Sequence, residues 1–141
     1  MFSKSTQYAL RAVLYLAVHT DVEHKANVKD IAQALDIPGP FLAKLLQQLS
    51  KNRLVSSTKG PFGGFYLSKD NLSAPLLNII NCIDGEETFH SCILGFPVCS
   101  STHPCPLHDK AMGYRNGLSQ LLTNNSIADL AEKIRTDEIK I

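Results

Sequence analysis

The chain has 141 residues, of which 44% are hydrophobic and 19% charged, so it suits one compact domain or a small domain with a helical appendage. No apolar run approaches the length of a membrane span, and residues 1–4 lead directly into an amphipathic helix instead of a signal-peptide pattern. We therefore expect a cytoplasmic protein with no membrane partner. The net charge of +1 hides an asymmetry: residues 1–70 carry nine Lys or Arg against five Asp or Glu, whereas residues 71–141 carry five against eight. A basic N-terminal half fits contact with a polyanion.

The first predicted element is an amphipathic helix that Ser3 or Ser5 can cap and that ends near His19. Its apolar residues recur at helical spacing and form one wide face: Tyr8, Ala9, Ala12, Val13, Leu16 and Ala17. Gln7 and Arg11 lie away from this face. They can contact DNA phosphates or can be ordinary solvated side chains, and the sequence leaves both interpretations open.

Two further helices are predicted in close succession. Asn27 can cap a helix over Val28–Leu35, and the prolines in residues 36–40 break it. A second helix starts near Pro40. Its apolar stripe consists of Phe41, Leu42, Leu45, Leu46 and Leu49. Lys44, Gln47 and Gln48 lie off the stripe, where they can contact phosphates or base edges.

A glycine-tipped hairpin follows this helix pair. Two short β-like runs, residues 54–57 and 65–67, flank a turn that carries Lys59 among Gly60, Gly63 and Gly64. Glycine lets a backbone approach another surface closely. Helix, turn, helix and hairpin in this order predict a winged helix-turn-helix, although a pair of core helices beside an ordinary hairpin is the alternative.

The predicted fold is therefore mainly α, with a small β-hairpin wing. In this fold the second helix of the pair enters the DNA major groove and the wing reaches the backbone or minor groove. The residues predicted to contact DNA are Gln7, Arg11, Pro40, Phe41, Lys44, Gln47, Gln48, Lys59, Gly60, Gly63 and Gly64.

The second half of the chain is predicted to contain a turn over residues 71–75, a helix through Asp84, and an irregular segment over residues 86–104. A long helix is predicted from Cys105 and Pro106 to about Leu122. Ser126 is predicted to cap a final helix, in a near capping box with Asp129. The charged tail over residues 135–141 is expected to fray. The chain is predicted to divide into a DNA-binding domain (1–70), a linking helix with a cysteine-bearing loop (71–104), and a dimerisation helix with a terminal helix (105–141).

Helix-turn-helix proteins usually bind DNA as dimers, so we expect the long helix to form a dimer interface. A monomer with the long helix folded back on itself is the alternative.

The cysteines point to a metal or redox site. Cys82 follows an apolar pattern and is expected to be a buried free thiol. Cys92, Cys99, Cys105 and His108 have the spacing C-x6-C-x5-C-x2-H, and these donor types bind iron–sulfur clusters or soft metals. A disulfide and a zinc site remain alternatives, and the fourth ligand can be His108, His103 or a residue of a partner subunit.

Four stretches resemble the Rrf-two-type family of bacterial winged-helix regulators, which includes IscR and NsrR. Residues 8–17 resemble its opening helix, residues 41–49 its reading helix, and residues 118–130 its dimer helix and the helix that follows. Residues 54–57 and 60–67 resemble its wing, which is the strongest match. The resemblance implies a homodimer on a palindromic operator, with a [2Fe–2S] or [4Fe–4S] cluster on Cys92, Cys99, Cys105 and His108. Two departures stand out: six residues instead of five separate Cys92 from Cys99, and Gln7 stands where the family usually has arginine.

We therefore predict a dimeric DNA-binding transcription regulator that senses iron–sulfur status, nitric oxide or redox stress through these cysteines. The alternative within regulation is a cluster-free protein of the same fold that uses thiol oxidation or a small-molecule effector. A metal-trafficking or scaffold protein without DNA binding is a second class. An enzyme is not expected, because the sequence offers no nucleophile–base pair and no phosphate-cradling loop with lysine.

Overall fold

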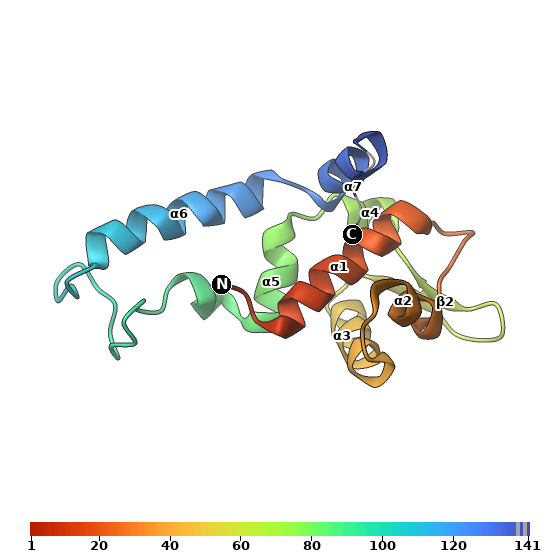
Figure 1. Ribbon diagram of the computed structural model, residues 1–141, viewed down its shortest axis with the longest axis horizontal. Helices are drawn as coiled ribbons and strands as arrows, with labels where there is room; N and C mark the ends of the chain where they lie inside the picture. Colours follow the sequence, from red (N-terminus) through yellow and green to blue (C-terminus); the bar gives the residue numbers. More distant parts are fainter. Residues whose placement is uncertain (138, 140) are drawn as a thin grey trace.

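The computed structural model describes residues 1–137, 139 and 141, and shows a helical body from which one long helix extends as an arm (Figure 1). The DNA-binding elements predicted from sequence lie at the end of the body opposite this arm. Within the described residues, no helix has both the length and the apolar character needed to cross a membrane.

Helix α1 (Lys4–His19) forms the centre of the body. Ser3 caps it, because its hydroxyl oxygen accepts a hydrogen bond from the Thr6 N–H at 3.1 Å. The apolar face predicted from sequence is buried, except for Tyr8 at its edge, which is partly buried. The helix packs mainly against α5 (Leu76–Asp84) and α7 (Ile127–Thr136). The predicted periodicity of this helix is confirmed.

The predicted helix pair is present. Helix α2 (Val28–Leu35) has the expected bounds, and the Asn27 side chain accepts from the Asp30 N–H at 2.8 Å. Asp36 ends it in the left-handed conformation, with φ of 53°. Helix α3 (Gly39–Lys51) begins one residue before Pro40, since proline is tolerated in a first turn where its missing N–H is not needed.

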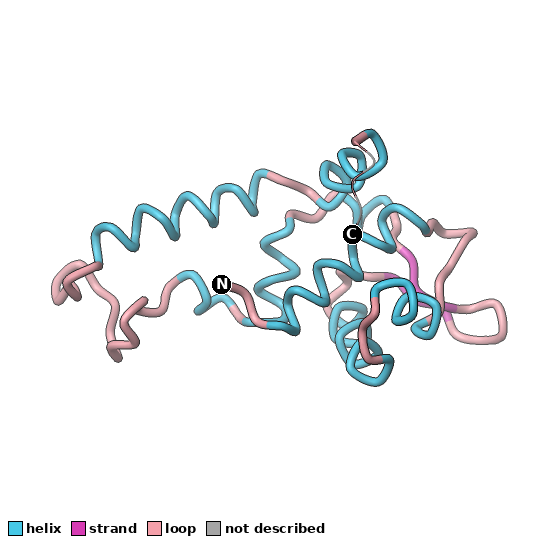
Figure 2. The backbone as a smooth tube through the Cα atoms, viewed as in Figure 1, coloured by secondary structure: helices cyan, strands magenta, loops and turns pink. Residues whose placement is uncertain are grey.

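The wing is an antiparallel pair of β1 (Ser56–Thr58) and β2 (Gly64–Tyr66), shown in magenta in Figure 2. Its inner edge is fixed to the body, because Phe65 and Ala26 exchange backbone hydrogen bonds at 2.8 and 2.9 Å. A side chain at Gly64 would meet the Ala26 carbonyl oxygen at 2.7 Å, so this close approach requires glycine.

A buried asparagine anchors the base of the wing. Asn71 belongs to the short helix α4 (Lys69–Leu72), which replaces the first part of the turn predicted over residues 71–75. Its amide donates to the Arg53 carbonyl oxygen at 3.0 Å, while its oxygen accepts from the Ser56 hydroxyl at 2.7 Å. Both polar ends of this buried side chain are therefore satisfied, as burial requires. The local capping box with Ser68, which shapes the helix, was not foreseen.

Helix α6 (His108–Asn124) forms the arm, and the irregular segment begins with a short 3-10 helix, η1 (Glu86–Phe89) (Figure 1). The predicted start of the long helix at Cys105 and Pro106 is wrong by about one turn. Residues 105–107 instead form a tight turn, closed by a hydrogen bond from the His108 N–H to the Cys105 carbonyl oxygen at 3.0 Å.

The C-terminal helix α7 carries the predicted capping box of Ser126 and Asp129. It extends further than expected, to Thr136, so that the Arg135 guanidinium reaches the Ala17 carbonyl oxygen at 2.6 Å. Fraying of the tail was predicted over residues 135–141, of which 138 and 140 lie outside the described residues.

The start of α1 is tied to the end of α5 through Asp84. The Ser3 N–H donates to one carboxylate oxygen of Asp84 at 3.2 Å, and the Ser3 hydroxyl donates to the other. Partial burial works to raise the pKa of Asp84, but the hydrogen bonds from Ser3 outweigh it and hold the pKa below its ordinary value of 3.8. The ionised carboxylate therefore stabilises the fold.

We predict that Asp84→Asn lowers the free energy of unfolding by about 1 kcal/mol at pH 7, as expected for loss of hydrogen bonds to a charged group that stays partly in water. Because the folded pKa is depressed, the contribution is complete above the unfolded pKa of 3.8 and disappears as pH falls through the lower folded pKa. Urea unfolding of both proteins from pH 7 to pH 3 measures this. A stability difference that does not shrink in acid would contradict the assignment.

Candidate DNA-binding face and cysteine segment

The exposed face of α3 carries polar side chains. Pro40, Lys44 and Gln47 are exposed, while the leucines of the same helix are buried against the body. Phe41 was predicted on the apolar stripe, but its side chain is 38% exposed. Its ring packs edge-on against Tyr8 with centroids 5.7 Å apart, so it links α3 to α1 at the boundary between core and solvent.

Three of the predicted DNA-contacting residues have partners inside the protein. Arg11 donates to the Leu35 carbonyl oxygen at 2.8 Å, Gln7 to the Phe2 carbonyl oxygen at 3.1 Å, and Gln48 to the Cys82 carbonyl oxygen at 2.9 Å. Arg11 thus satisfies an orphan carbonyl at the end of α2. Its guanidinium has five N–H donors, so a phosphate contact stays a prediction.

The wing tip is a tight turn with a defined shape. The Gly63 N–H donates to the Gly60 carbonyl oxygen at 3.0 Å, and Gly60 has φ of +101°. A side chain at Gly63 would come within 2.3 Å of the Thr58 carbonyl oxygen. Glycine is therefore required at both ends of this turn, and Lys59 beside it is exposed.

The wing and α3 are held beside one another. The hydroxyl groups of Ser50, on α3, and Ser57, on β1, lie 3.2 Å apart. Lys25, in the loop between α1 and α2, lies close to the wing, because its ammonium group is 5.6 Å from the centre of the Tyr66 ring. The end of α3 and the first strand of the wing therefore lie next to each other, and the DNA contacts of both stay a prediction.

The cysteine segment, residues 90–107, connects the body to the far end of the arm (Figure 1). All four cysteines of the chain, including Cys82 in α5, carry free thiols. Cys92 is buried and faces the Cys105 thiol. Burial works to raise the pKa of Cys92. The backbone N–H groups of residues 94–96 and the Cys105 thiol overcome this effect and lower its pKa.

Cys99 forms a second pair, with His108. Its Sγ lies 3.4 Å from Nδ1 of His108, a side chain that is only 7% exposed at the start of α6. Arg115, two turns further along α6, also contacts Cys99 Sγ at 3.3 Å through Nη2. Its Nη1 donates to the Ser91 carbonyl oxygen at 2.5 Å.

The predicted ligands therefore stand as two pairs. Within the part of the chain that the structure describes, no three His, Cys, Asp or Glu side chains converge closely enough to hold one metal ion. Three thiols and an imidazole are nevertheless the donor types that iron–sulfur clusters take, so the segment fits such a group in its ligand chemistry. His103, the other candidate fourth ligand, is exposed and lies beside Thr102.

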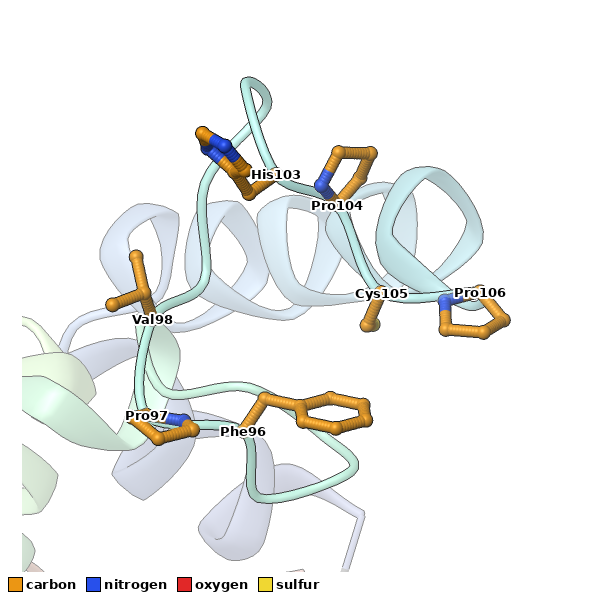
Figure 3. A pocket seen from close by; sticks show the side chains of 7 residues that line it. All are labelled: Phe96, Pro97, Val98, His103, Pro104, Cys105 and Pro106. Carbon is orange, nitrogen blue, oxygen red and sulfur yellow. The ribbon is translucent and has the colours of Figure 1, made fainter.

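An open cavity of about 350 Å³ lies beside the segment (Figure 3). Its lining is mostly apolar and comprises Phe96, Pro97, Val98, His103, Pro104, Cys105 and Pro106. The side chains of Cys105 and Phe96 face one another across it. One thiol of the segment is therefore reachable from solvent.

Arg115 was not predicted from the sequence. Its role depends on contacts with Ser91 and Cys99, which lie 24 and 16 positions earlier in the chain, and no local pattern indicates such contacts. The sequence showed only that the predicted long helix carries an arginine to which no role could be assigned.

With this geometry established, comparison with known proteins decides the family. The sequence profile of the Rrf2 family, described as "Iron-dependent Transcriptional regulator", matches residues 2–133. The chain belongs to the Rrf2 family. It is thus a transcription regulator of a DNA-binding family and not an enzyme.

Two relatives illustrate the range of similarity. A transcriptional regulator of the HTH type from Aquifex aeolicus is 35% identical over 132 residues, which cover 92% of this chain and 90% of the relative. The regulator IscR of Photorhabdus laumondii is 29% identical over 141 aligned positions, covering 94% of this chain and 85% of IscR.

Solved structures confirm the winged helix-turn-helix fold. CymR, the global cysteine regulator of B. subtilis, superimposes with a TM-score of 0.75 at 23% identity, covering 94% of this chain and 97% of CymR. T. potens IscR gives a TM-score of 0.76 at 20% identity, with 100% and 93% covered. At these identities the likeness establishes the fold.

Arg115 allows a direct test of what orders the cysteine segment. We predict that Arg115→Ala accelerates proteolytic cleavage within residues 90–107 by about five- to tenfold, since hydrogen bonds from a charged group typically contribute roughly 1.5–3 kcal/mol before solvent exposure reduces them. Asn116→Ala, an exposed neighbour on α6, serves as the control. Equal cleavage rates in wild type and Arg115→Ala would show that other contacts hold the segment.

Proposed function

We propose that this protein is a homodimeric transcription regulator that binds a palindromic operator and senses iron–sulfur status, nitric oxide or redox stress through its cysteine segment. The main support for this proposal is that one chain has two candidate functional surfaces, one at each end of the molecule. One end presents α3 and the wing tip, and the other presents Cys92, Cys99, Cys105 and His108. The family description, which names iron, supports the second surface.

For DNA binding, α3 enters the major groove and the wing contacts the backbone or minor groove. Lys44 and Lys59 supply positive charge for phosphates, while Gln47 can pair with a base edge. The exposed backbone of Gly60 can approach a phosphate closely. Phe41 packs α3 against α1 and Gln48 bonds it to α5, so these two residues orient α3, while Arg11 holds the end of α2.

For dimerisation, α6 offers apolar side chains that are exposed among the described residues, including Tyr114 and Leu121. An open groove of about 970 Å³ lies between α6 and the N-terminal residues, with Phe2, Phe89 and Leu118 among its lining. Tyr114 is 83% exposed on the same helix, between Gly113 and Gly117, which both face open space. A second copy of α6 can approach closely there, which would place two wings and two α3 helices on one duplex.

For sensing, Cys92, Cys99 and Cys105 would hold an iron–sulfur cluster, with His108 as the fourth ligand. When bound, the cluster supplies a centre that changes redox state or reacts with nitric oxide. Arg115 positions Cys99 against α6, and His108 lies in the first turn of the same helix. Binding of the cluster would therefore act on the helix that we assign to the dimer interface. It would change DNA affinity only if the dimer has two arrangements that bind the cluster with different affinities.

A thiol switch is the second candidate, and the pairing of Cys92 with Cys105 favours it. Hydrogen peroxide would oxidise the two thiols to a disulfide; the thiols give up two protons and two electrons, and the peroxide is reduced to two molecules of water. A disulfide in protein purified without iron would support this candidate over the cluster.

The DNA-binding assignment predicts a specific salt dependence. Lys44→Ala and Lys59→Ala should each weaken binding and reduce the slope of log affinity against log salt by about one per subunit, because each lysine releases counterions from one phosphate. The probe is a duplex that the wild-type protein selects from a random-sequence library. Lys133→Ala, on α7, is the control with an unchanged slope. Unchanged slopes in all three variants would contradict the assigned face.

The cluster assignment predicts that protein purified without oxygen contains iron and acid-labile sulfide and absorbs visible light. Cys99→Ala should lose this absorption, because it removes one thiolate ligand. Cys82→Ala is the matched control, since Cys82 lies in α5 and outside the segment, and it should keep the absorption. Visible absorption retained in Cys99→Ala would refute the ligand role of this residue.

A further inference from the structure

Phe62 is the most exposed aromatic side chain among the described residues, with 92% of its surface open to solvent. Exposed apolar surface contributes nothing to folding, and burying a phenylalanine ring is worth roughly 1.5–3 kcal/mol. The ring is therefore available for a contact outside its own chain. It lies on the wing, within a half of the chain that carries net positive charge.

The backbone around Phe62 is held in a defined turn. The hydrogen bond between Gly60 and Gly63 closes a turn in which Pro61 and Phe62 are the two central residues. Proline fixes its own backbone angle, and the crowding around Gly63 admits no side chain there. Phe62 thus projects from a preformed apex, so little backbone entropy is lost when it binds.

The neighbours of Phe62 indicate what it contacts. Lys59 stands beside the turn and can pair with a phosphate, whereas the phenyl ring can form neither an ion pair nor a conventional hydrogen bond. A cation beside an apolar side chain on a fixed turn matches the minor groove. Its walls are apolar sugars between two rows of phosphates, and inserted phenylalanine side chains are a known means of binding it.

We propose that Phe62 enters the DNA minor groove and makes an apolar contact there that selects the groove shape flanking the sites read by α3. This proposal rests on the DNA-binding function above and names the element that reads the flanks. Lys59 anchors the tip on the DNA backbone. Phe62 favours minor grooves whose shape accepts the phenyl ring over those whose shape does not.

The test compares Phe62→Ala and Phe62→Leu with wild type on the duplex selected by the wild-type protein. Phe62→Ala should weaken binding roughly tenfold or more, and Phe62→Leu by less, because leucine keeps an apolar side chain. The salt slope should stay at the wild-type value in both variants, in contrast to Lys59→Ala, because no phosphate contact is removed. Val22→Ala, an exposed apolar residue outside the wing, is the control.

The groove is identified with a modified duplex. Replacing flanking adenines with 2,6-diaminopurine adds an amino group in the minor groove and leaves the major-groove edge unchanged. This duplex should bind wild type several-fold more weakly and Phe62→Ala almost as well as the unmodified one. Phe62→Ala with wild-type affinity, or with a reduced salt slope, would overturn the inference while leaving the DNA-binding function intact. Absence of binding by the wild-type protein to every duplex would overturn both.

Discussion

Helix α1 packs at the centre of the body, and both functional ends of the molecule are positioned by it. Its buried face includes Ala9, Ala12 and Ala17, and these small side chains let α5 and α7 lie close to its axis. Contacts from this helix and from its N-cap residue fix both functional ends of the molecule. Arg11 holds the end of α2, and Ser3 holds the end of α5, from which the chain continues into the cysteine segment. The DNA-binding elements and the arm therefore take their positions from one helix.

Sequence patterns predicted those parts of the fold that depend on residues three or four positions apart. The bounds of α2, its Asn27 cap and the capping box at Ser126 are of this kind, because helical periodicity and capping are local properties. The wing was predicted from its glycines. Contacts that span many positions were not foreseen, among them the bonds from Arg11 and Gln48 to backbone carbonyls 24 and 34 positions away.

The cysteine segment shows the same limit. Donor types and spacing indicated a redox or metal site, and the structure brings them together in two pairs, Cys92 with Cys105 and Cys99 with His108. Spacing could not show which donors meet, since a loop without regular structure has no period from which to infer neighbours. It also could not show that Arg115 fastens the segment to α6. This fastening gives chemistry at the thiols a physical route to the helix that we assign to dimerisation.

In the proposed function, chemistry at the cysteine segment changes DNA affinity at the opposite end of the molecule. The most direct test measures the affinity of one preparation for its selected duplex before and after anaerobic loading with iron and sulfide. We predict a change of about fivefold or more, the lower range of coupling energies between linked sites, and its loss in Cys99→Ala. Equal affinities of the loaded and unloaded protein would contradict the claim.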